Sequence, residues 1–427
     1  MLRFILIILC GMITSCYYFP LILRSHLWFN TKTIMGAIGL GLILYDLSKD
    51  RLAINMRTYL RLILYALVVS FVGYVSITLN NTPDNVYATY ISSMAVWLCA
   101  AYVAVSVIKA VHHQLTFQLI ANYIIGVCVF QCVMTLCIEY IPVVKAQVDS
   151  IFFMDQVFLE NVNRLYGLGA FLDTAGIRYS VALVLAAYLM LEYSRKGSGQ
   201  LLTWVYVLSF IMIGFVGNMV ARTTLVGVVI GLLLLLTCNL FIKRETNISL
   251  RRILRAFVLS AVVAVPFIVH YYNSNVEFKN QMEFGFEGFF NLFNDGQWEV
   301  GSNVQLKRMV VWPESLKTWI IGDGYFNNPD AVDPYYIGEY VGGYYKGTDI
   351  GYLRFIFYFG VIGLLAFSIF IIKAGELCMK TWPGRNLVFT LIIVVNFIVW
   401  LKVSTDLFLV FALFLAMPPT LPEEKCN

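Results

Sequence analysis

The sequence predicts an all-α integral membrane protein with about twelve transmembrane helices and one large extracytoplasmic loop. Of its 427 residues, 60% are hydrophobic and only 13% are charged, whereas a soluble protein of average composition carries about 25% charged residues. The mean hydropathy is +0.77. Apolar runs of about 18 residues or more recur along the whole chain, and each could cross the ~30 Å hydrocarbon core of a bilayer as a helix. We therefore expect one helical bundle in the membrane rather than several soluble domains.

Twelve segments of the chain are predicted to span the membrane. The first has no small-residue cleavage site before Tyr17 and is followed by further spans, so we interpret it as a helix and not as a signal peptide. The second is short, and only Lys402 separates the last two. The predicted spans lie near residues 3–23, 33–46, 58–79, 87–108, 116–140, 175–193, 201–219, 223–242, 253–272, 351–372, 386–401 and 403–418.

The distribution of Lys and Arg predicts the orientation. If the N-terminus lies inside, 17 of the 30 basic residues fall on the inner side, and most of the remainder fall in two long outer segments where the positive-inside rule carries little weight. Both termini are therefore predicted to be cytoplasmic. The inner residues are Arg3, Lys49, Arg51, Arg57, Arg61, Lys109, Arg195, Lys196, Lys243, Arg244, Arg251, Arg252, Arg255, Lys373, Lys380, Arg385 and Lys425.

Two outer segments are too long to be simple connectors. A medium loop is predicted at about 142–174, and a large extracytoplasmic loop at 273–350. The large loop separates spans one to nine, in residues 1–272, from the last three spans and a short cytoplasmic tail, in residues 351–427.

The large loop carries signals of local structure. Ser302 and Gln305 fit a capping box that would open a helix running towards Trp319. Pro313 should kink or restart this helix. The sequence Ile321-Gly-Asp-Gly-Tyr325 predicts a tight turn.

Common signatures of soluble enzymes are missing from the sequence. It contains no phosphate-binding loop, GxGxxG, HExxH or DxD motif, and its four histidines do not cluster. Its nine cysteines fall mainly in apolar spans, where a small buried hydrophobe is the simpler interpretation. We predict no metal and no cofactor. The net charge of +5 needs no nucleic-acid partner, because much of it lies in short loops on one side.

Arginines at predicted outer helix ends are the first candidate site residues. Arg222 lies where one span ends and the next begins, and Arg164 and Arg178 precede or open the sixth span. Arg308 follows Gln305 in the large loop. Each arginine alone could be a snorkelling or solvated charge. Several guanidinium groups that converge would instead suit a phosphate or pyrophosphate, which they bind through bidentate, charge-assisted hydrogen bonds.

An acidic residue and an aromatic-rich loop are the second set of candidates. Asp349 lies where the large loop re-enters the membrane, and it could be a helix N-cap or a general base. Trp312 belongs to a set of loop aromatics whose faces suit sugar rings, although aromatic residues also gather at membrane interfaces.

Three stretches within about 160–370 resemble the O-antigen polymerase and O-antigen ligase family of bacterial polysaccharide assembly. Residues 164–176 look like that family's Arg…Gly segment entering a span, and Val220-Ala-Arg-Thr-Thr-Leu225 resembles its motif between two helices. The third stretch is discontinuous. It consists of Gln305 to Arg308, Trp312, Gly322-Asp-Gly324, Asp349-Ile-Gly-Tyr352-Leu and Tyr358-Phe-Gly-Val-Ile-Gly363.

The resemblance implies a bundle similar to that of the glycosyltransferase-C fold, in the bacterial cytoplasmic (inner) membrane. It implies metal-independent glycosyl transfer from a polyprenyl-pyrophosphate-linked glycan at the outer face. Arg222 and Arg308 would hold the pyrophosphate and Asp349 would deprotonate the acceptor hydroxyl. Further substrate contacts would come from Arg164, Arg178, Gln305, Trp312 and Tyr352. The implied partners are membrane lipid and a chain-length regulator and flippase of the same pathway, without nucleic acid.

One departure from the family distinguishes the alternatives. Ligases of the family carry a His-Asn pair where this chain has Asp349-Ile350, and the large loop has no histidine. This favours a polymerase that joins repeat units into O-antigen, capsular or exopolysaccharide. A ligase that passes the glycan to a lipid A core is the alternative within the family. A multi-pass transporter or flippase is the alternative from another class, with Glu192 and Asp406 as candidate charges near span ends.

Overall fold

The computed structural model describes residues 2–49, 56–153, 164–196, 200–241, 247–337 and 343–420. The predicted cytoplasmic tail from residue 421 lies outside the described residues, as do 154–163 and 338–342 in the two predicted loops. The chain folds as two compact units. Unit 1 comprises Met1–Ile34 and Val107–Trp298, and unit 2 comprises Met35–Ser106 and Glu299–Asn427.

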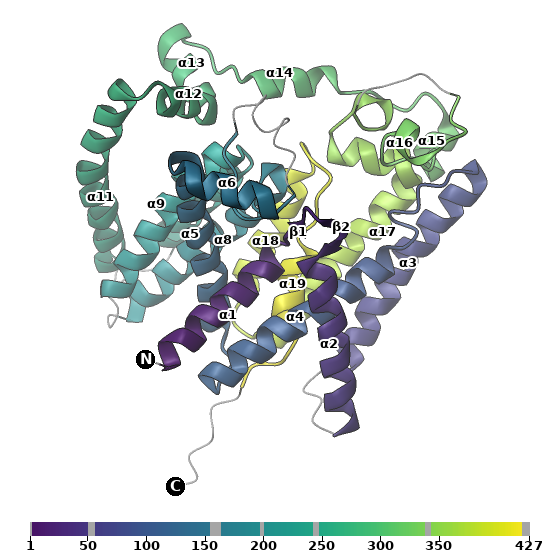
Figure 1. Ribbon diagram of the computed structural model, residues 1–427, viewed down its shortest axis with the longest axis horizontal. Helices are drawn as coiled ribbons and strands as arrows, with labels where there is room; N and C mark the ends of the chain where they lie inside the picture. The colour runs from purple at the N-terminus through teal and green to yellow at the C-terminus, as the bar shows by residue number, and fades with distance from the viewer. Residues whose placement is uncertain are drawn as a thin grey trace. The chain divides into compact units, whose positions relative to one another are not determined.

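The described part of the chain is predominantly helical (Figure 1), and each predicted span overlaps a helix. The main helices are α1 Leu2–Tyr18, α2 Thr31–Ser48, α3 Met56–Asn80, α4 Tyr90–His112, α5 Phe117–Tyr140, α6 Pro142–Ile151, α8 Leu172–Lys196, α9 Gln200–Val220, α10 Thr224–Phe241, α11 Asn247–Ser274, α12 Val276–Gly285, α13 Glu287–Asp295, α14 Gly301–Arg308, α15 Leu316–Ile321, α16 Pro329–Val332, α17 Gly351–Thr381, α18 Asn386–Val399 and α19 Phe408–Leu415. A 3-10 turn covers Tyr345–Gly347. A two-stranded antiparallel hairpin, β1 Ile22–Leu23 and β2 His26–Asn30, is a small exception to the all-α prediction.

Among the described residues, seven helices are long and apolar enough to cross a membrane. They lie in α3, α4, α5, α8, α9, α11 and α17. Apolar helices α1, α10 and α18 are shorter. The protein is therefore a multi-pass membrane protein, and the number of about twelve spans stays a prediction.

Unit 1 is built around α8, which packs against α5, α9, α10 and α11. Small residues let α8 and α10 approach closely, since a Cβ on Gly227 would lie 2.2 Å from the Cα of Ser180. The Ser180 hydroxyl donates to the Thr223 carbonyl at 2.9 Å and accepts from the Gly227 amide at 3.1 Å. Small residues and interhelical hydroxyl bonds are typical of helix contacts in membranes. They fix the start of α10 against α8.

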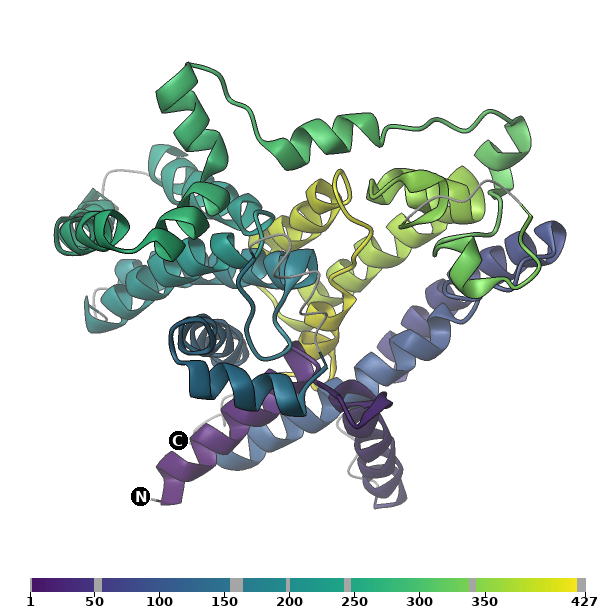
Figure 2. The ribbon, with the colours of Figure 1, turned by 45° about the horizontal axis from the view of Figure 1, so that its top comes forward.

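Unit 2 is built around α17, which runs alongside α3 (Figure 1 and Figure 2) and also contacts α15, α18 and α19. The helix α17 is broken at Phe359 and Gly360. Gly360 has φ of 67°, and a Cβ there would lie 2.0 Å from the Ile320 carbonyl oxygen. Only glycine fits such a position without strain.

The break in α17 frees carbonyl groups that the surrounding chain satisfies. The backbone amides of Asp323 and Gly324 donate to the carbonyls of Phe357 and Tyr358 at 2.6 and 3.1 Å, and the Ser76 hydroxyl donates to Tyr358 at 2.6 Å. Without water, each bare carbonyl would cost several kcal/mol. The segment around Asp323 bends at Gly324 and has positive φ at Gly322 and Gly324, and its amides cap the broken helix.

One prediction made for the segment between α13 and α17 is wrong. The capping box at Ser302 is wrong, because the N-cap of α14 is Val300 and no side chain caps it. The helix ends at Arg308, and α15 begins after Ser315, whose hydroxyl accepts from the Thr318 amide at 3.0 Å. The predicted interruption at Pro313 is confirmed, since the proline lies in the gap between the two helices.

Candidate functional site

Two predicted arginines of unit 1 meet at one aromatic ring. Arg164 precedes α8, and Arg222 lies in the short break between α9 and α10. Their guanidinium carbons lie 5.8 and 4.1 Å from the ring centroid of Phe284 in α12. A cation over a ring face is attracted by the negative charge of that face. We call Arg164, Asp173, Arg222, Phe284 and Glu287 the arginine cluster.

Arg222 is the most extensively bound member of the arginine cluster. Its Nε and Nη2 donate to the Phe284 carbonyl at 3.1 and 2.9 Å, and Nη2 lies 2.7 Å from Oε2 of Glu287. Its side chain is only 13% exposed. Burial lowers the pKa of Arg222 from its ordinary value, and the Glu287 carboxylate opposes this effect. The guanidinium still stays charged at neutral pH.

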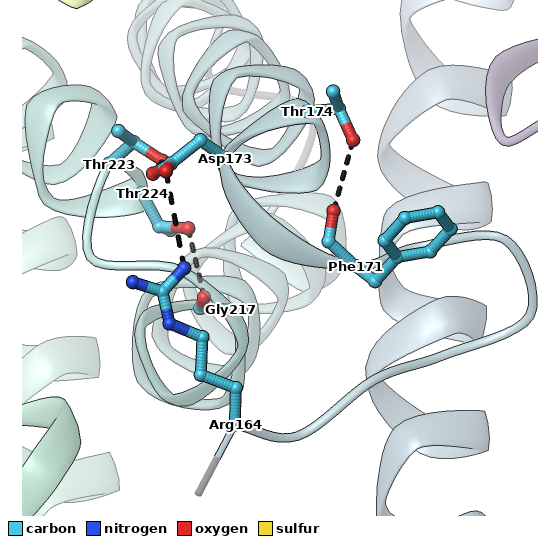
Figure 3. A network of polar contacts seen from close by, with 7 residues as sticks. All are labelled: Arg164, Phe171, Asp173, Thr174, Gly217, Thr223 and Thr224. Atoms are coloured by element: carbon cyan, nitrogen blue, oxygen red, sulfur yellow. Dashed lines mark hydrogen bonds and ion pairs between the residues drawn. The ribbon is translucent and has the colours of Figure 1, made fainter. Parts of the chain in front are cut away.

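Arg164 is held more loosely. Its Nη1 lies 4.0 Å from Oδ2 of Asp173, whose Oδ1 accepts a hydrogen bond from the Thr223 hydroxyl at 3.1 Å. Figure 3 shows Arg164 pointing towards Asp173 at the start of α8. Its Nε is buried and has no hydrogen-bond partner among the described residues. Arg164 therefore keeps a donor for a further acceptor.

The local sequence explains why the break between α9 and α10 is held in place. The Thr224 hydroxyl donates to the Gly217 carbonyl at 2.9 Å (Figure 3), and the Asn218 amide donates to the Gly285 carbonyl at 2.6 Å. A Cβ on Gly176 would lie 1.9 Å from the Thr223 hydroxyl. Glycine at 176 thus makes room for the Thr223 side chain beside Asp173.

The arginine cluster has the chemistry of an anion site. Its two cations interact electrostatically with one another, and each is paired with a carboxylate. An anion that contacts both guanidiniums would relieve their repulsion. Arginine presents its donors in a planar fork that matches phosphate oxygens.

The remaining predicted arginine of unit 1 lies elsewhere. Arg178 is in α8, where its guanidinium carbon lies 5.5 Å from the ring centroid of Phe19. Its backbone carbonyl accepts a hydrogen bond from the Tyr18 hydroxyl at 3.2 Å. The structure therefore places Arg178 against the end of α1 and not over Phe284.

Three predicted site residues belong to α14 and to the connection that follows it in unit 2. Gln305 and Arg308 lie on α14 with exposed side chains. Trp312 is 61% exposed, and its ring stacks on that of Trp319 with centroids 6.0 Å apart and an interplanar angle of 16°. These side chains are open to a ligand.

The other two predicted residues flank the start of α17. Asp349 does not cap the helix, because the N-cap is Ile350 and no side chain caps it; the N-cap interpretation is wrong. Asp349 interacts electrostatically with Arg354. The Tyr352 hydroxyl donates to the Phe397 carbonyl at 2.9 Å, so this residue joins α17 to α18.

Sequence reasoning missed Arg354, a buried arginine in the first turn of α17. Its guanidinium carbon lies 3.8 Å from the ring centroid of Phe326 and 3.4 Å from that of Tyr344. It donates to the Phe326 carbonyl at 3.0 Å and to the Ser404 hydroxyl at 2.7 Å. A signal existed, since an arginine within a predicted span is costly and marks a special environment.

A cluster of tyrosines and acids lies in unit 2. Its tyrosines belong to the loop aromatics noted in the sequence, but their pairing with acids was not predicted. The Tyr325 hydroxyl donates to Asp333 at 2.5 Å, and the Tyr345 hydroxyl donates to Asp323 at 3.3 Å. The two tyrosine rings lie 5.3 Å apart. The pKa of each of the two tyrosine hydroxyls is raised above its usual value, mainly by burial. We call Asp323, Tyr325, Asp333 and Tyr345 the tyrosine–acid cluster.

A buried acid anchors this part of unit 2. Oδ2 of Asp84, in the connection between α3 and α4, accepts from the backbone amides of Phe326 and Asn327 at 2.9 and 2.8 Å. Two amide donors to one carboxylate oxygen fix the backbone next to Tyr325. Sequence reasoning could not find this contact, because the two segments are far apart in the chain.

The comparisons with known proteins add no relative. No family model matches the chain, and no curated protein and no solved structure matches it. Among the described residues, no group of three or more His, Cys, Asp or Glu side chains could hold a metal ion.

Proposed function

We propose that the protein is a polysaccharide polymerase, which joins polyprenyl-pyrophosphate-linked oligosaccharide units at the outer face of the bacterial cytoplasmic membrane. The arginine cluster carries the proposal. Arg164 and Arg222 come from separate segments and converge on Phe284, and a pair of guanidiniums suits a pyrophosphate. In this proposal the chain crosses the membrane about twelve times, both termini are cytoplasmic, and the site is extracytoplasmic.

The donor half of the reaction falls to the arginine cluster. The pyrophosphate would accept a hydrogen bond from the unpartnered Nε of Arg164. It would also replace the Glu287 carboxylate as the anion bound to Arg222. When the bond between the anomeric carbon and the pyrophosphate oxygen breaks, that oxygen keeps the electron pair, and the two guanidiniums stabilise the added charge. The polyprenyl pyrophosphate then leaves.

For the acceptor half of the reaction, the family resemblance assigns Asp349 as the base. A hydroxyl of the acceptor sugar attacks the anomeric carbon, and Asp349 takes its proton as the new glycosidic bond forms. The tyrosine–acid cluster offers ring faces and carboxylates, which suit the faces and hydroxyls of sugars. The exposed Trp312 would extend this surface.

A reconstituted assay with purified lipid-linked repeat units tests the proposal. Wild-type protein should produce a ladder of products on a gel. Arg222→Ala should lower the rate by about 10² to 10³-fold, the scale for a lost charge-stabilising donor. Arg222→Lys should recover part of the rate, because an ammonium keeps the charge but not the fork.

The matched control is Lys279→Ala, which removes a half-exposed charge from α12, the helix that carries Phe284. It should leave the ladder unchanged. A normal ladder from folded Arg222→Ala protein would refute the donor site. Transfer of single units to a lipid A core, without a ladder, would show a ligase instead.

Cysteine labelling tests the proposed orientation. In a cysteine-free background, Cys at Ser302 or Asn328 should react with an impermeant thiol reagent added to intact cells. Cys at Ser48, in a predicted inner loop, should react only after the membrane is opened. Labelling of Ser48→Cys in intact cells would put the arginine cluster in the wrong compartment.

A transporter is the second candidate, and the break in α17 favours it. Broken helices often line substrate paths in transporters, where free carbonyls coordinate ions. Here the freed carbonyls of Phe357 and Tyr358 already accept bonds from within the chain. Flux of a lipid-linked glycan across proteoliposomes by a protein that makes no polymer would establish this candidate.

A further inference from the structure

An apolar groove in unit 1 lies between α1 and α5 and reaches the end of α4. Its volume is about 470 Å³. Apart from His112, Asn122 and Tyr123, its lining is apolar. The groove is separate from the arginine cluster, with which it shares no residue.

Two glycines create the groove. A Cβ on Gly11 of α1 or on Gly126 of α5 would meet no atom within 4 Å. Beside these glycines, Ile8, Met12 and Phe130 keep large exposed surfaces. A leucine at either glycine would project into this space, so the groove depends on two missing side chains.

The length of the groove corresponds to one leaflet of a bilayer. Along α5 its lining runs from Leu119 to Phe130, a rise of about 16 Å at 1.5 Å per residue. The hydrocarbon core of a bilayer is ~30 Å thick, so one leaflet measures about half of that. An acyl chain of a lipid in one leaflet has the length that this groove accepts.

One end of the groove is basic. The ring Nε2 of His112 lies 2.9 Å from the Tyr123 hydroxyl. The positive charges at this end are those of Arg3, which interacts electrostatically with His112, and of Lys109, one turn earlier in α4.

An acid also lies near this end of α5. Glu192 of α8 accepts a hydrogen bond from Gln118 at 2.8 Å. Neither of these two residues lines the groove. The charges at the mouth of the groove therefore favour an anion.

We propose that this groove binds one acyl chain of an anionic phospholipid, with the lipid phosphate at Arg3 and His112. Basic pockets between membrane helices recognise anionic head groups in this way. A neutral lipid would fill the apolar part equally well but would gain nothing from the basic end. The bound lipid would fix α1 against α5.

Retention of lipid by the purified full chain tests the proposal. Wild-type protein purified in mild detergent should carry about one phosphatidylglycerol in native mass spectrometry, held in part by the basic end of the groove. Gly126→Leu should reduce this retention by at least about tenfold. A tenfold loss corresponds to about 1.4 kcal/mol of binding free energy. Gly11→Leu fills the groove from its other wall and replaces Gly126→Leu if that variant aggregates.

Gly41→Leu is the matched control. Gly41 lies in α2, and a Cβ there also meets no atom within 4 Å, so this change should leave retention unchanged. Arg3→Gln should remove the preference for phosphatidylglycerol over phosphatidylcholine. Full retention by folded Gly126→Leu and Gly11→Leu proteins, an equal loss in Gly41→Leu, or equal retention of phosphatidylcholine by the wild type would each overturn the proposal.

Discussion

The two units each bury an arginine against a phenylalanine, in nearly the same way. Arg222 in unit 1 lies over the Phe284 ring and donates to the carbonyl of the same residue. Arg354 in unit 2 lies over Phe326 and donates to that residue's carbonyl. Their neighbours differ. Arg222 has a carboxylate at 2.7 Å, from Glu287. Arg354 contacts a second ring and the Ser404 hydroxyl, and it interacts electrostatically with Asp349.

This difference separates a binding role from a structural role. A carboxylate partner can be exchanged for another anion, because phosphate makes the same charge-assisted bonds. An arginine between two rings is held by packing and ring charge, and an incoming anion would have to displace aromatic side chains. Arg222 is therefore suited to a ligand, and Arg354 is suited to joining α17 to the segment around Phe326.

Removal of Arg354 should have the largest effect on stability. The residue is 7% exposed, and Arg354→Ala would lose two buried cation–ring contacts, of about 2 kcal/mol each, and two hydrogen bonds. We expect a loss of about 3 kcal/mol or more in the free energy of unfolding, and poor yield of folded protein. Arg222→Ala should keep a near-normal melting temperature in the same thermal assay. A larger loss of stability in Arg222→Ala than in Arg354→Ala would invert the assignment.

Removal of the charge of Asp349 should have the next largest effect, and on activity. Asp349→Asn should slow chain extension by about 10²-fold, the scale for a positioned general base. Asp349 also interacts electrostatically with Arg354. If this interaction is the only role of Asp349, its replacement should change stability and not the rate of chain extension. In that case Asp349→Asn would destabilise the wild type but not the uncharged variant Arg354→Gln, and a double-mutant cycle of melting temperatures would reveal the coupling.

Replacement of Glu287 should have a smaller effect, and in the opposite direction. Glu287→Gln keeps the shape but removes the anion that competes at Arg222. Binding of inorganic pyrophosphate to the purified protein should become several-fold tighter, within the 1.5–3 kcal/mol of a hydrogen bond to a charged group. The comparison is with Glu283→Gln, which changes a half-exposed acid of α12. Weaker binding in Glu287→Gln would mean that Glu287 positions Arg222 instead of competing for it.

The sequence predicted the helices more completely than it predicted their contacts. Apolar runs predict membrane helices because side chains that face the hydrocarbon core are apolar. Every predicted span contains a helix. The sequence predicted that Arg164 and Arg222 lie on the same side of the membrane. It did not predict their partners Phe284 and Glu287. Contacts between segments this far apart depend on tertiary packing, which no local pattern records.

Two local signals failed for different reasons. Ser302 and Gln305 have the spacing of a capping box, yet the helix starts earlier at Gly301 after Val300, so the spacing alone did not fix the end of the helix. Gly360 lies in the predicted span 351–372, and no break was predicted there. Glycine is common in membrane helices, and its positive φ becomes evident only with the backbone of Ile320 beside it.

The break at Gly360 also affects the order in which unit 2 is assembled. Half of α17 would expose carbonyl groups to lipid if it entered the membrane by itself, and their donors come from Ser76, Asp323 and Gly324. All three donors precede α17 in the chain, so they are synthesised before the helix that needs them. Insertion of α17 thus depends on segments that are already in place, and a truncated chain that begins after Gly324 would have no means of shielding the break.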